Sequence, residues 1–236
     1  MSIKHTLLTA ALLALAQSVA AATFSFAGNF SADTDVALFS FTLAQPTAGV
    51  ELRTFGYAGG TNAAGQVIAS GGFEPVLSLF LADGTQMNPM PSGPCGGVLP
   101  VDPSTGVCGD VDYTTERSFP AGVWQPGTYI AALSLSLNGS VGNFADGFFA
   151  NAVLGLSNPS NFVCAMVAPG LADGAAFCDQ TNPGVVRNGQ WALDIIHVDS
   201  AKTVPLPSGI SLFALSVGLM AWRVRAREAS SLRVRI

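Results

Sequence analysis

Apolar and polar residues alternate with a period of two at several points along this chain, and this alternation restricts it to a fold built from β-strands. The pattern is clearest at residues 23–30 and 36–43, where aromatic side chains alternate with small or polar ones. Successive side chains of a strand point to opposite faces, so each segment can bury one face. Asp33-Thr34-Asp35 lies between them and is typical of a turn. The sequence therefore predicts two strands joined by a short acidic turn.

Other segments have the same strand-like character. Pro75, near the start of one of them, is compatible with a first strand residue or with an edge strand. No segment of the domain shows a convincing helical period, and we expect residues 199–203 to be a short linker. The further predicted strands are 50–55, 73–81 and 190–198, and within 125–137 a turn leads into a long strand. This pattern predicts an all-β fold, a single β-sandwich with long loops.

The loops between these segments are rich in glycine and proline. Residues 57–72 hold several glycines but lack the Gly-Lys-Ser/Thr ending of a phosphate-binding loop, which favours a structured surface loop. Residues 86–118 and 157–188 are long irregular segments, and each contains two cysteines. A disulfide would make a loop of that length tolerable in a compact domain.

The chain has four cysteines, Cys95, Cys108, Cys164 and Cys178. Four cysteines allow three pairings, and we favour the two local ones, Cys95 with Cys108 and Cys164 with Cys178, which each close a loop of about a dozen residues. Zinc is the competing interpretation, but the spacing lacks Cys-x-x-Cys pairs.

The first 22 residues have the layout of a secretory signal peptide. Lys4 precedes an apolar stretch at 7–16, and small residues at 18–22 offer a cleavage site. The apolar stretch is too short for a stable membrane span. We therefore expect 1–22 to be a signal peptide and 23–203 to be an exported domain.

Charge is distributed unevenly along the chain, whose formal net charge is -5. Within the predicted domain the basic residues are Arg53, Arg117, Arg187 and Lys202, and acidic residues outnumber them. Such a domain would repel phosphate backbones, which argues against nucleic-acid binding.

The region 204–236 has the layout of a sorting signal. Val204-Pro205-Leu206-Pro207-Ser208 is followed by the apolar run 210–222 and then by Arg223, Arg225 and Arg227. The apolar run is shorter than the roughly 20 residues that cross a bilayer comfortably. We expect a short transmembrane segment at 210–222 with its arginines on the cytoplasmic side.

This ending resembles the PEP-CTERM sorting signal of Gram-negative bacteria, with Val204-Pro205-Leu206-Pro207-Ser208 standing where the family has Val-Pro-Glu-Pro-Ser. The resemblance implies that an exosortase recognises the motif and cleaves near it, starting from an inner-membrane intermediate. The domain would then reach the cell surface or the medium, commonly in organisms that make exopolysaccharide.

The domain itself resembles the bacterial pre-peptidase C-terminal type of β-sandwich. The resemblance covers mainly residues 23–150, and the segments that carry it are 24–30, 35–41, 53–62, 71–80 and 127–129. It implies a jelly-roll-like core and a mostly non-catalytic attachment of a secreted protein.

Catalytic residues are hard to find in this sequence. His197 is the only histidine outside the signal peptide, no Gly-x-Ser-x-Gly elbow is present, and we interpret His197 as structural or exposed. A glycosidase would need paired carboxylates, but the spacing of Glu51, Glu74 and Glu116 recommends no pair. We therefore expect no enzyme activity.

Calcium is the cofactor that the sequence best accommodates. Asp33 with Asp35, and Asp110 with Asp112, present alternate carboxylates in turn-like settings, and hard cations prefer such oxygens. The alternative is that aspartate simply favours turns.

The expected function is that of a non-enzymatic cell-envelope or extracellular-matrix protein, sorted by an exosortase and associated with exopolysaccharide or biofilm. One alternative is a module that binds carbohydrate or a small ligand through residues 57–72 and exposed aromatic residues such as Trp124. The other is a secreted hydrolase.

Overall fold

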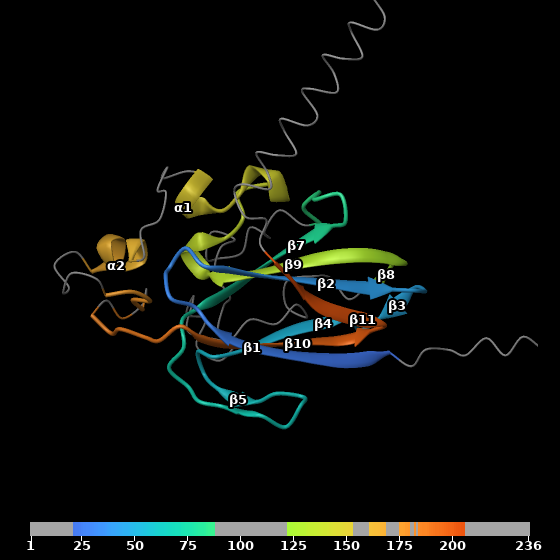
Figure 1. Ribbon diagram of the computed structural model, residues 1–236, viewed down its shortest axis with the longest axis horizontal. Helices are drawn as coiled ribbons and strands as arrows, with labels where there is room; N and C mark the ends of the chain where they lie inside the picture. The colour runs from blue at the N-terminus through green and yellow to red at the C-terminus, as the bar shows by residue number, and fades with distance from the viewer. Residues whose placement is uncertain are drawn as a thin grey trace, which may run out of the picture.

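The structure is a computed structural model of the 236-residue chain, and it describes residues 21–87, 122–152, 161–168, 175–179, 182 and 184–205. These residues form a mostly β fold in which two antiparallel sheets lie one over the other (Figure 1). The all-β prediction is confirmed at this level.

The first sheet has three strands in the order β1-β10-β4. They are β1 (Ala22–Asn29), β10 (Gln190–Val198) and β4 (Glu51–Phe55). In the central strand, β10, Leu193 pairs with Phe26 of β1 and Asp194 pairs with Arg53 of β4. The first strand begins at Ala22, the last residue of the predicted signal peptide.

The second sheet has four strands in the order β11-β2-β9-β7. They are β11 (Ser200–Val204), β2 (Val36–Leu43), β9 (Gly127–Leu135) and β7 (Pro75–Leu81). Pro75 is the first residue of an edge strand, where its missing N–H costs no ladder hydrogen bond.

Two small ribbons and several short helices complete the described fold. The ribbons pair β3 (Thr47–Ala48) with β8 (Val123–Trp124) and β5 (Gly60–Thr61) with β6 (Val67–Ile68). The helices are η2 (Ser136–Asn138), η3 (Phe144–Asp146), α1 (Phe149–Ala152) and α2 (Phe162–Val167). The sequence predicted no helix within the domain 23–203, because α1 and α2, with 4 and 6 residues, are too short to show a helical period.

The main core lies between the two sheets and is built by the alternation seen in the sequence. In β2 the side chains of Phe39 and Phe41 face this core, as do Leu133 of β9 and Leu193 of β10. Phe39 lies 4.9 Å from Phe26 between ring centroids, so the aromatic residues of β1 and β2 pack across the sheets.

The opposite face of the second sheet carries a smaller apolar cluster. It consists of Leu38, Phe80, Ala132 and Phe148, and Val204 packs against it. Phe148 comes from the segment 136–152, which therefore covers part of this face. The second sheet is thus buried on both faces where this segment lies.

The predicted linker at 199–203 is wrong, because Ser200–Val204 forms β11. This strand pairs with β2, with Val204 opposite Leu38. It lies at a sheet edge, and Lys202 is exposed there. A polar edge strand lacks the apolar face that marks a strand in a sequence, and a lysine there is a common protection against edge-to-edge pairing.

The acidic turn between β1 and β2 crosses from one sheet to the other, because the two strands belong to different sheets. Asp33 therefore lies at one end of the fold, where the chain changes layer.

Within the described part of the chain, no helix has the length and apolar character needed to cross a membrane. The predicted transmembrane segment 210–222 and residues 1–20 of the predicted signal peptide lie outside the described residues.

Candidate functional site

The most elaborate polar contacts of the described chain gather around one disulfide. Cys164, in α2, and Cys178 are bonded to each other, with their Cα atoms 4.9 Å apart, and both are buried. This confirms the predicted local pairing of Cys164 with Cys178. Cys95 and Cys108 lie outside the described residues. We call residues 161–168, 175–179, 182 and 184–188 the disulfide region.

Asp33 anchors the disulfide region to the turn between β1 and β2. Its carboxylate is fully buried and accepts hydrogen bonds from the backbone N–H of Val163 at 2.9 Å and of Phe177 at 2.7 Å. Burial raises the pKa of Asp33, the backbone hydrogen bonds oppose that rise, and the nearby charge of Asp35 adds to it. The turn that the sequence predicted is therefore also an attachment point.

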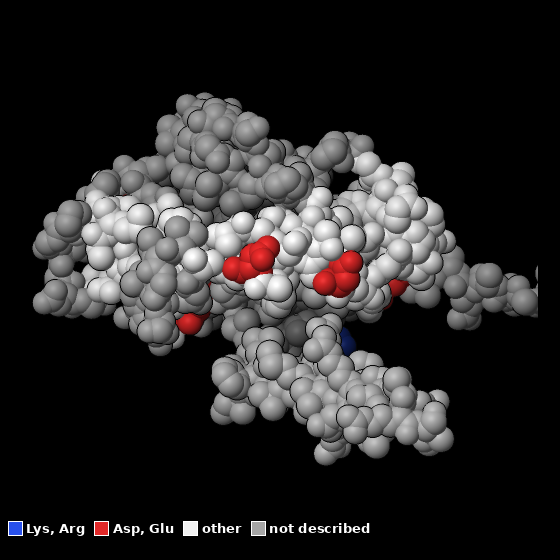
Figure 2. Space-filling model, turned by 90° about the horizontal axis from the view of Figure 1, so that it is seen from above, with Lys and Arg blue, Asp and Glu red and all other residues white. Residues whose placement is uncertain are grey.

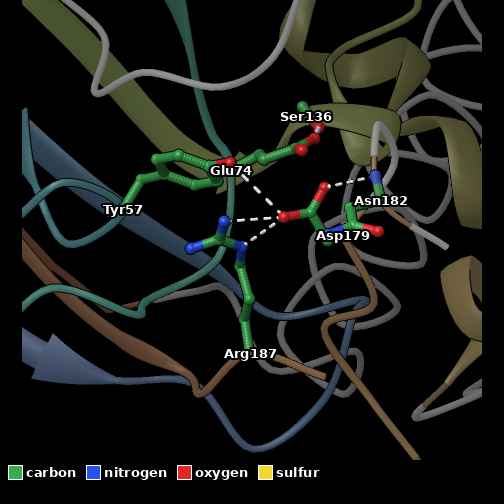
Figure 3. Close-up of polar contacts among 6 residues, drawn as sticks. All are labelled: Tyr57, Glu74, Ser136, Asp179, Asn182 and Arg187. Atoms are coloured by element: carbon green, nitrogen blue, oxygen red, sulfur yellow. Dashed lines mark hydrogen bonds and ion pairs between the residues drawn. The ribbon is translucent and has the colours of Figure 1, made fainter. Parts of the chain in front are cut away.

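Asp179 forms a second anchor, shown in Figure 3. Its Oδ2 atom accepts from Arg187 Nε at 2.7 Å, lies 2.6 Å from Arg187 Nη2, and accepts from the Tyr57 hydroxyl at 3.3 Å. Its Oδ1 atom accepts from the backbone N–H of Asn182 at 2.9 Å. The Arg187 guanidinium carbon lies 3.6 Å from the centre of the Tyr57 ring, a cation–π contact.

Glu74 lies beside these contacts, between Tyr57 and Ser136 in Figure 3, and is also buried. Its carboxylate accepts from Ser136 Oγ at 3.3 Å, and its backbone oxygen accepts from Ser136 N at 2.9 Å. These contacts join the residue before β7 to η2. Glu74 thus links the second sheet to the segment that covers its outer face.

The Asp179 contacts cross-link segments that are far apart in sequence. Tyr57 belongs to the loop after β4, whereas Asp179 and Arg187 belong to the disulfide region. A buried carboxylate is tolerated when a cation and hydrogen-bond donors surround it. Both carboxylate oxygens of Asp179 are engaged, so the arrangement holds the loop against the disulfide region.

Close backbone contacts at this end of the fold require glycine. A Cβ on Gly72 would lie 2.5 Å from the backbone oxygen of Gln190, and a Cβ on Gly189 would overlap the backbone oxygen of Phe30. The glycine-rich character of the loop therefore serves backbone packing at Gly72, beside the start of β10.

The residues predicted to bind calcium have other partners where the structure describes them. The carboxylate of Asp35 accepts from the backbone N–H groups of Ser31 at 2.6 Å and Ala32 at 3.0 Å, and Asp33 holds the disulfide region. Asp110 and Asp112 lie outside the described residues. Among the residues that are described, no three His, Cys, Asp or Glu side chains gather as a metal site. The calcium site remains a prediction.

Trp124 is not the exposed aromatic residue that the sequence suggested. It is half-buried, and its ring packs 5.1 Å from Tyr129 and 5.9 Å from Phe41. In Figure 1 its strand, β8, lies at the opposite end of the fold from α2. Tyr57, in the other segment predicted to bind a ligand, stacks on Arg187.

His197 is exposed, which is one of the two alternatives that the sequence left open. It has a φ of 61°, and its Nδ1 atom lies 2.6 Å from the backbone oxygen of Gly49. The register of β1 and β10 shifts at this point, since Ala22 pairs with Val198 and Thr23 with Ile196. His197 is therefore the extra residue of a β-bulge, where a left-handed backbone is common.

The carboxylates considered for a glycosidase pair do not lie together where the structure describes them. Glu51 forms an ion pair of 2.6 Å with Arg53 in β4, whereas Glu74 lies in the buried cluster described above. Glu116 lies outside the described residues.

The sorting motif begins where the folded chain leaves the sheet. Val204 is the last residue of β11, half-buried, and Pro205 after it is exposed. Leu206, Pro207 and Ser208 lie outside the described residues.

The contacts among Tyr57, Asp179 and Arg187 escaped sequence reasoning. The available signal was the scarcity of basic residues in the domain, which makes Arg187 a natural partner for a nearby buried acid. The same scarcity of charge is visible in Figure 2, where a few acidic residues stand among uncharged ones on one face of the described chain.

Comparisons with protein-family models, with curated proteins and with solved structures found no match to this chain.

Proposed function

We propose that this chain is a non-catalytic exported module that an exosortase processes at its C-terminus and delivers to the cell surface or matrix, where it associates with exopolysaccharide. Its domain is a jelly-roll-like sandwich of the pre-peptidase C-terminal type, made from a three-stranded and a four-stranded sheet. The sequence resemblances set out above are the origin of this proposal, and three structural observations support it.

The end of β11 is the observation that carries the proposal. Val204 pairs with Leu38 and packs against the apolar cluster on the outer face of the second sheet. It is also the first residue of the predicted sorting motif, and Pro205 is exposed. The sheets therefore use no described residue beyond the first position of the motif, so cleavage after Val204 would leave both sheets complete.

The disulfide supports the export half of the proposal. Disulfides persist in oxidising compartments such as the periplasm and the cell surface and are rare in the cytosol of most organisms. The bond between Cys164 and Cys178 is buried, so it belongs to the folded interior.

The polar clusters support a non-catalytic role. The carboxylates of Asp33 and Asp179 are occupied by backbone N–H groups, by Arg187 and by Tyr57. Groups used in this way hold the fold together, and a structural module requires nothing further from them.

The test is the intact mass of the mature protein made in a Gram-negative host that has an exosortase. We expect a product that lacks Trp222. The Pro205→Ala/Pro207→Ala variant should accumulate uncleaved, whereas Pro46→Ala, at an exposed proline before β3, should be processed normally. A mature wild-type protein that still contains Trp222 would contradict the proposal.

A further inference from the structure

The two cysteines of the disulfide lie in separate segments that meet at one carboxylate. Val163 immediately precedes Cys164, and Phe177 immediately precedes Cys178. The backbone N–H of each of these preceding residues donates to Asp33, Val163 to Oδ2 and Phe177 to Oδ1. One carboxylate thus bridges the two chain segments directly beside their sulfur-bearing residues.

Asp33 comes from a part of the chain that is remote in sequence from both cysteines. It lies 130 residues from Val163 and 144 from Phe177, in the turn where the chain crosses from β1 to β2. Asp33 and Val163 are fully buried, and Cys164 and Cys178 are buried. Solvent therefore does not compete for these hydrogen bonds in the folded chain.

We propose that Asp33 is a positioning residue for the formation of the Cys164–Cys178 disulfide. When the turn between β1 and β2 has formed, its carboxylate binds Val163 N–H and Phe177 N–H together and holds the two thiols within reach of each other. The β1–β2 turn therefore positions the two cysteines, and the disulfide then fixes this arrangement covalently.

The backbone of Phe177 fits this role. Its φ of 59° is in the left-handed region, which costs free energy for a residue with a large side chain. The hydrogen bond to Asp33 Oδ1 holds Phe177 in that conformation and so sets the direction in which the chain enters Cys178.

The covalent step needs an oxidant, and a small-molecule disulfide supplies it. The thiolate of one cysteine attacks the oxidant disulfide, which forms a mixed disulfide and releases one thiol. The thiolate of the second cysteine then attacks the protein sulfur of the mixed disulfide and releases the second thiol. Two protein thiols are oxidised, and one disulfide is reduced to two thiols. Asp33 takes no part in the electron transfer and raises only the effective concentration of the second thiol.

Three variants separate this role from general effects. Asp33→Asn keeps one acceptor oxygen and turns an N–H group toward the other donor, and Asp33→Ser keeps a single acceptor. Asp35→Asn is the matched control, because Asp35 is in the same turn and binds Ser31 and Ala32 but not the disulfide region.

The experiment oxidises the reduced full-length protein in a buffer of reduced and oxidised glutathione, traps free thiols by alkylation, and maps disulfides by peptide mass spectrometry. We expect the effective concentration of the Cys164–Cys178 pair to fall about tenfold in Asp33→Asn and Asp33→Ser, the size expected for lost hydrogen bonds to a charged group. Asp35→Asn should match the wild type. In 8 M urea, where the fold is lost, the wild type and the three variants should show the same effective concentration of the pair.

Cys95 and Cys108, which the sequence predicts to form a second local pair, are the internal control for a variant that folds poorly. A selective fall in Cys164–Cys178 supports the positioning role. An equal fall in both pairs points to general misfolding and overturns it, as does an unchanged Cys164–Cys178 pair. This measurement uses no exosortase, so it stands or falls independently of the proposed function.

Discussion

The core between the sheets and the disulfide region are stabilised in different ways. In the core, apolar side chains from the inner faces of both sheets, seven strands in all, pack against one another. No single one of these side chains is the sole link between two distant segments. The disulfide region also contributes apolar residues to this core, among them Phe162, Val163 and Phe177. Two carboxylates, Asp33 and Asp179, add buried polar connections between the region and the rest of the fold. The core is therefore stabilised by apolar packing spread over many residues, whereas the disulfide region relies in addition on a few specific polar contacts.

The largest expected effect is a cavity in the core. Phe39 is fully buried and contacts the rings of Phe26 and Trp191. Phe39→Ala should lower the free energy of unfolding by about 4 kcal/mol, through lost burial and the cavity left behind. Urea unfolding followed by tryptophan fluorescence measures it. Val67→Ala is the control, since Val67 is 81% exposed and its loss should cost less than about 0.5 kcal/mol. Similar losses in the two variants would show that the core does not dominate.

How well the sequence predicts each region follows from the same difference. The bounds of β2 and β10 were predicted correctly because alternation repeats over every residue of a strand. The contact from Phe177 to Asp33 spans 144 residues and leaves no periodic trace. Sequence reasoning identified Asp33 as a turn residue and a calcium candidate, but it could not see which backbone donors would reach it.

The edge position of β11 explains why the sequence predicted a linker there. In β11, which was predicted as a linker, three of five residues are exposed, so its pattern is that of a loop. Only its pairing with β2 makes it a strand.

The next largest effect should come from the disulfide region. Arg187→Met removes the cation beside the buried Asp179 and should cost about 3 kcal/mol, because it leaves a buried carboxylate without its partner. Arg53→Met is the matched control. Glu51 is also largely buried, but the Arg53 side chain is 44% exposed, against 17% for Arg187, so water can replace it more easily and its loss should cost about 1 kcal/mol. Adding Asp179→Asn to Arg187→Met should restore part of the loss. Equal costs for the two arginine variants would contradict the anchoring role of Asp179.

The smallest effect is a pH dependence that Asp33 alone should cause. Burial raises the pKa of this carboxyl above its usual 3.8. As the pH falls, the folded chain therefore binds a proton before the unfolded chain does. The stabilising contribution of this pKa shift is fully present below pH 3.8 and is lost as the pH rises through the raised pKa of the folded chain.

The comparison that isolates this effect is wild type against Asp33→Asn. The difference in their free energies of unfolding should shift in favour of the wild type as the pH is lowered through that window, and it should be constant above it. Urea unfolding at closely spaced pH values measures the slope. A shift in the opposite direction would mean that the hydrogen bonds from Val163 and Phe177 outweigh the cost of burial.

Amide hydrogen exchange, read peptide by peptide, tests most directly whether the two regions are held separately. In Asp33→Asn, residues 162–167, 177–179 and 184–187 should exchange faster than in the wild type, while peptides from β2, β9 and β10 keep their protection. Faster exchange throughout the strands, or unchanged exchange in the disulfide region, would contradict the claim that the buried carboxylate of Asp33 is one of the two that attach this region to the rest of the fold.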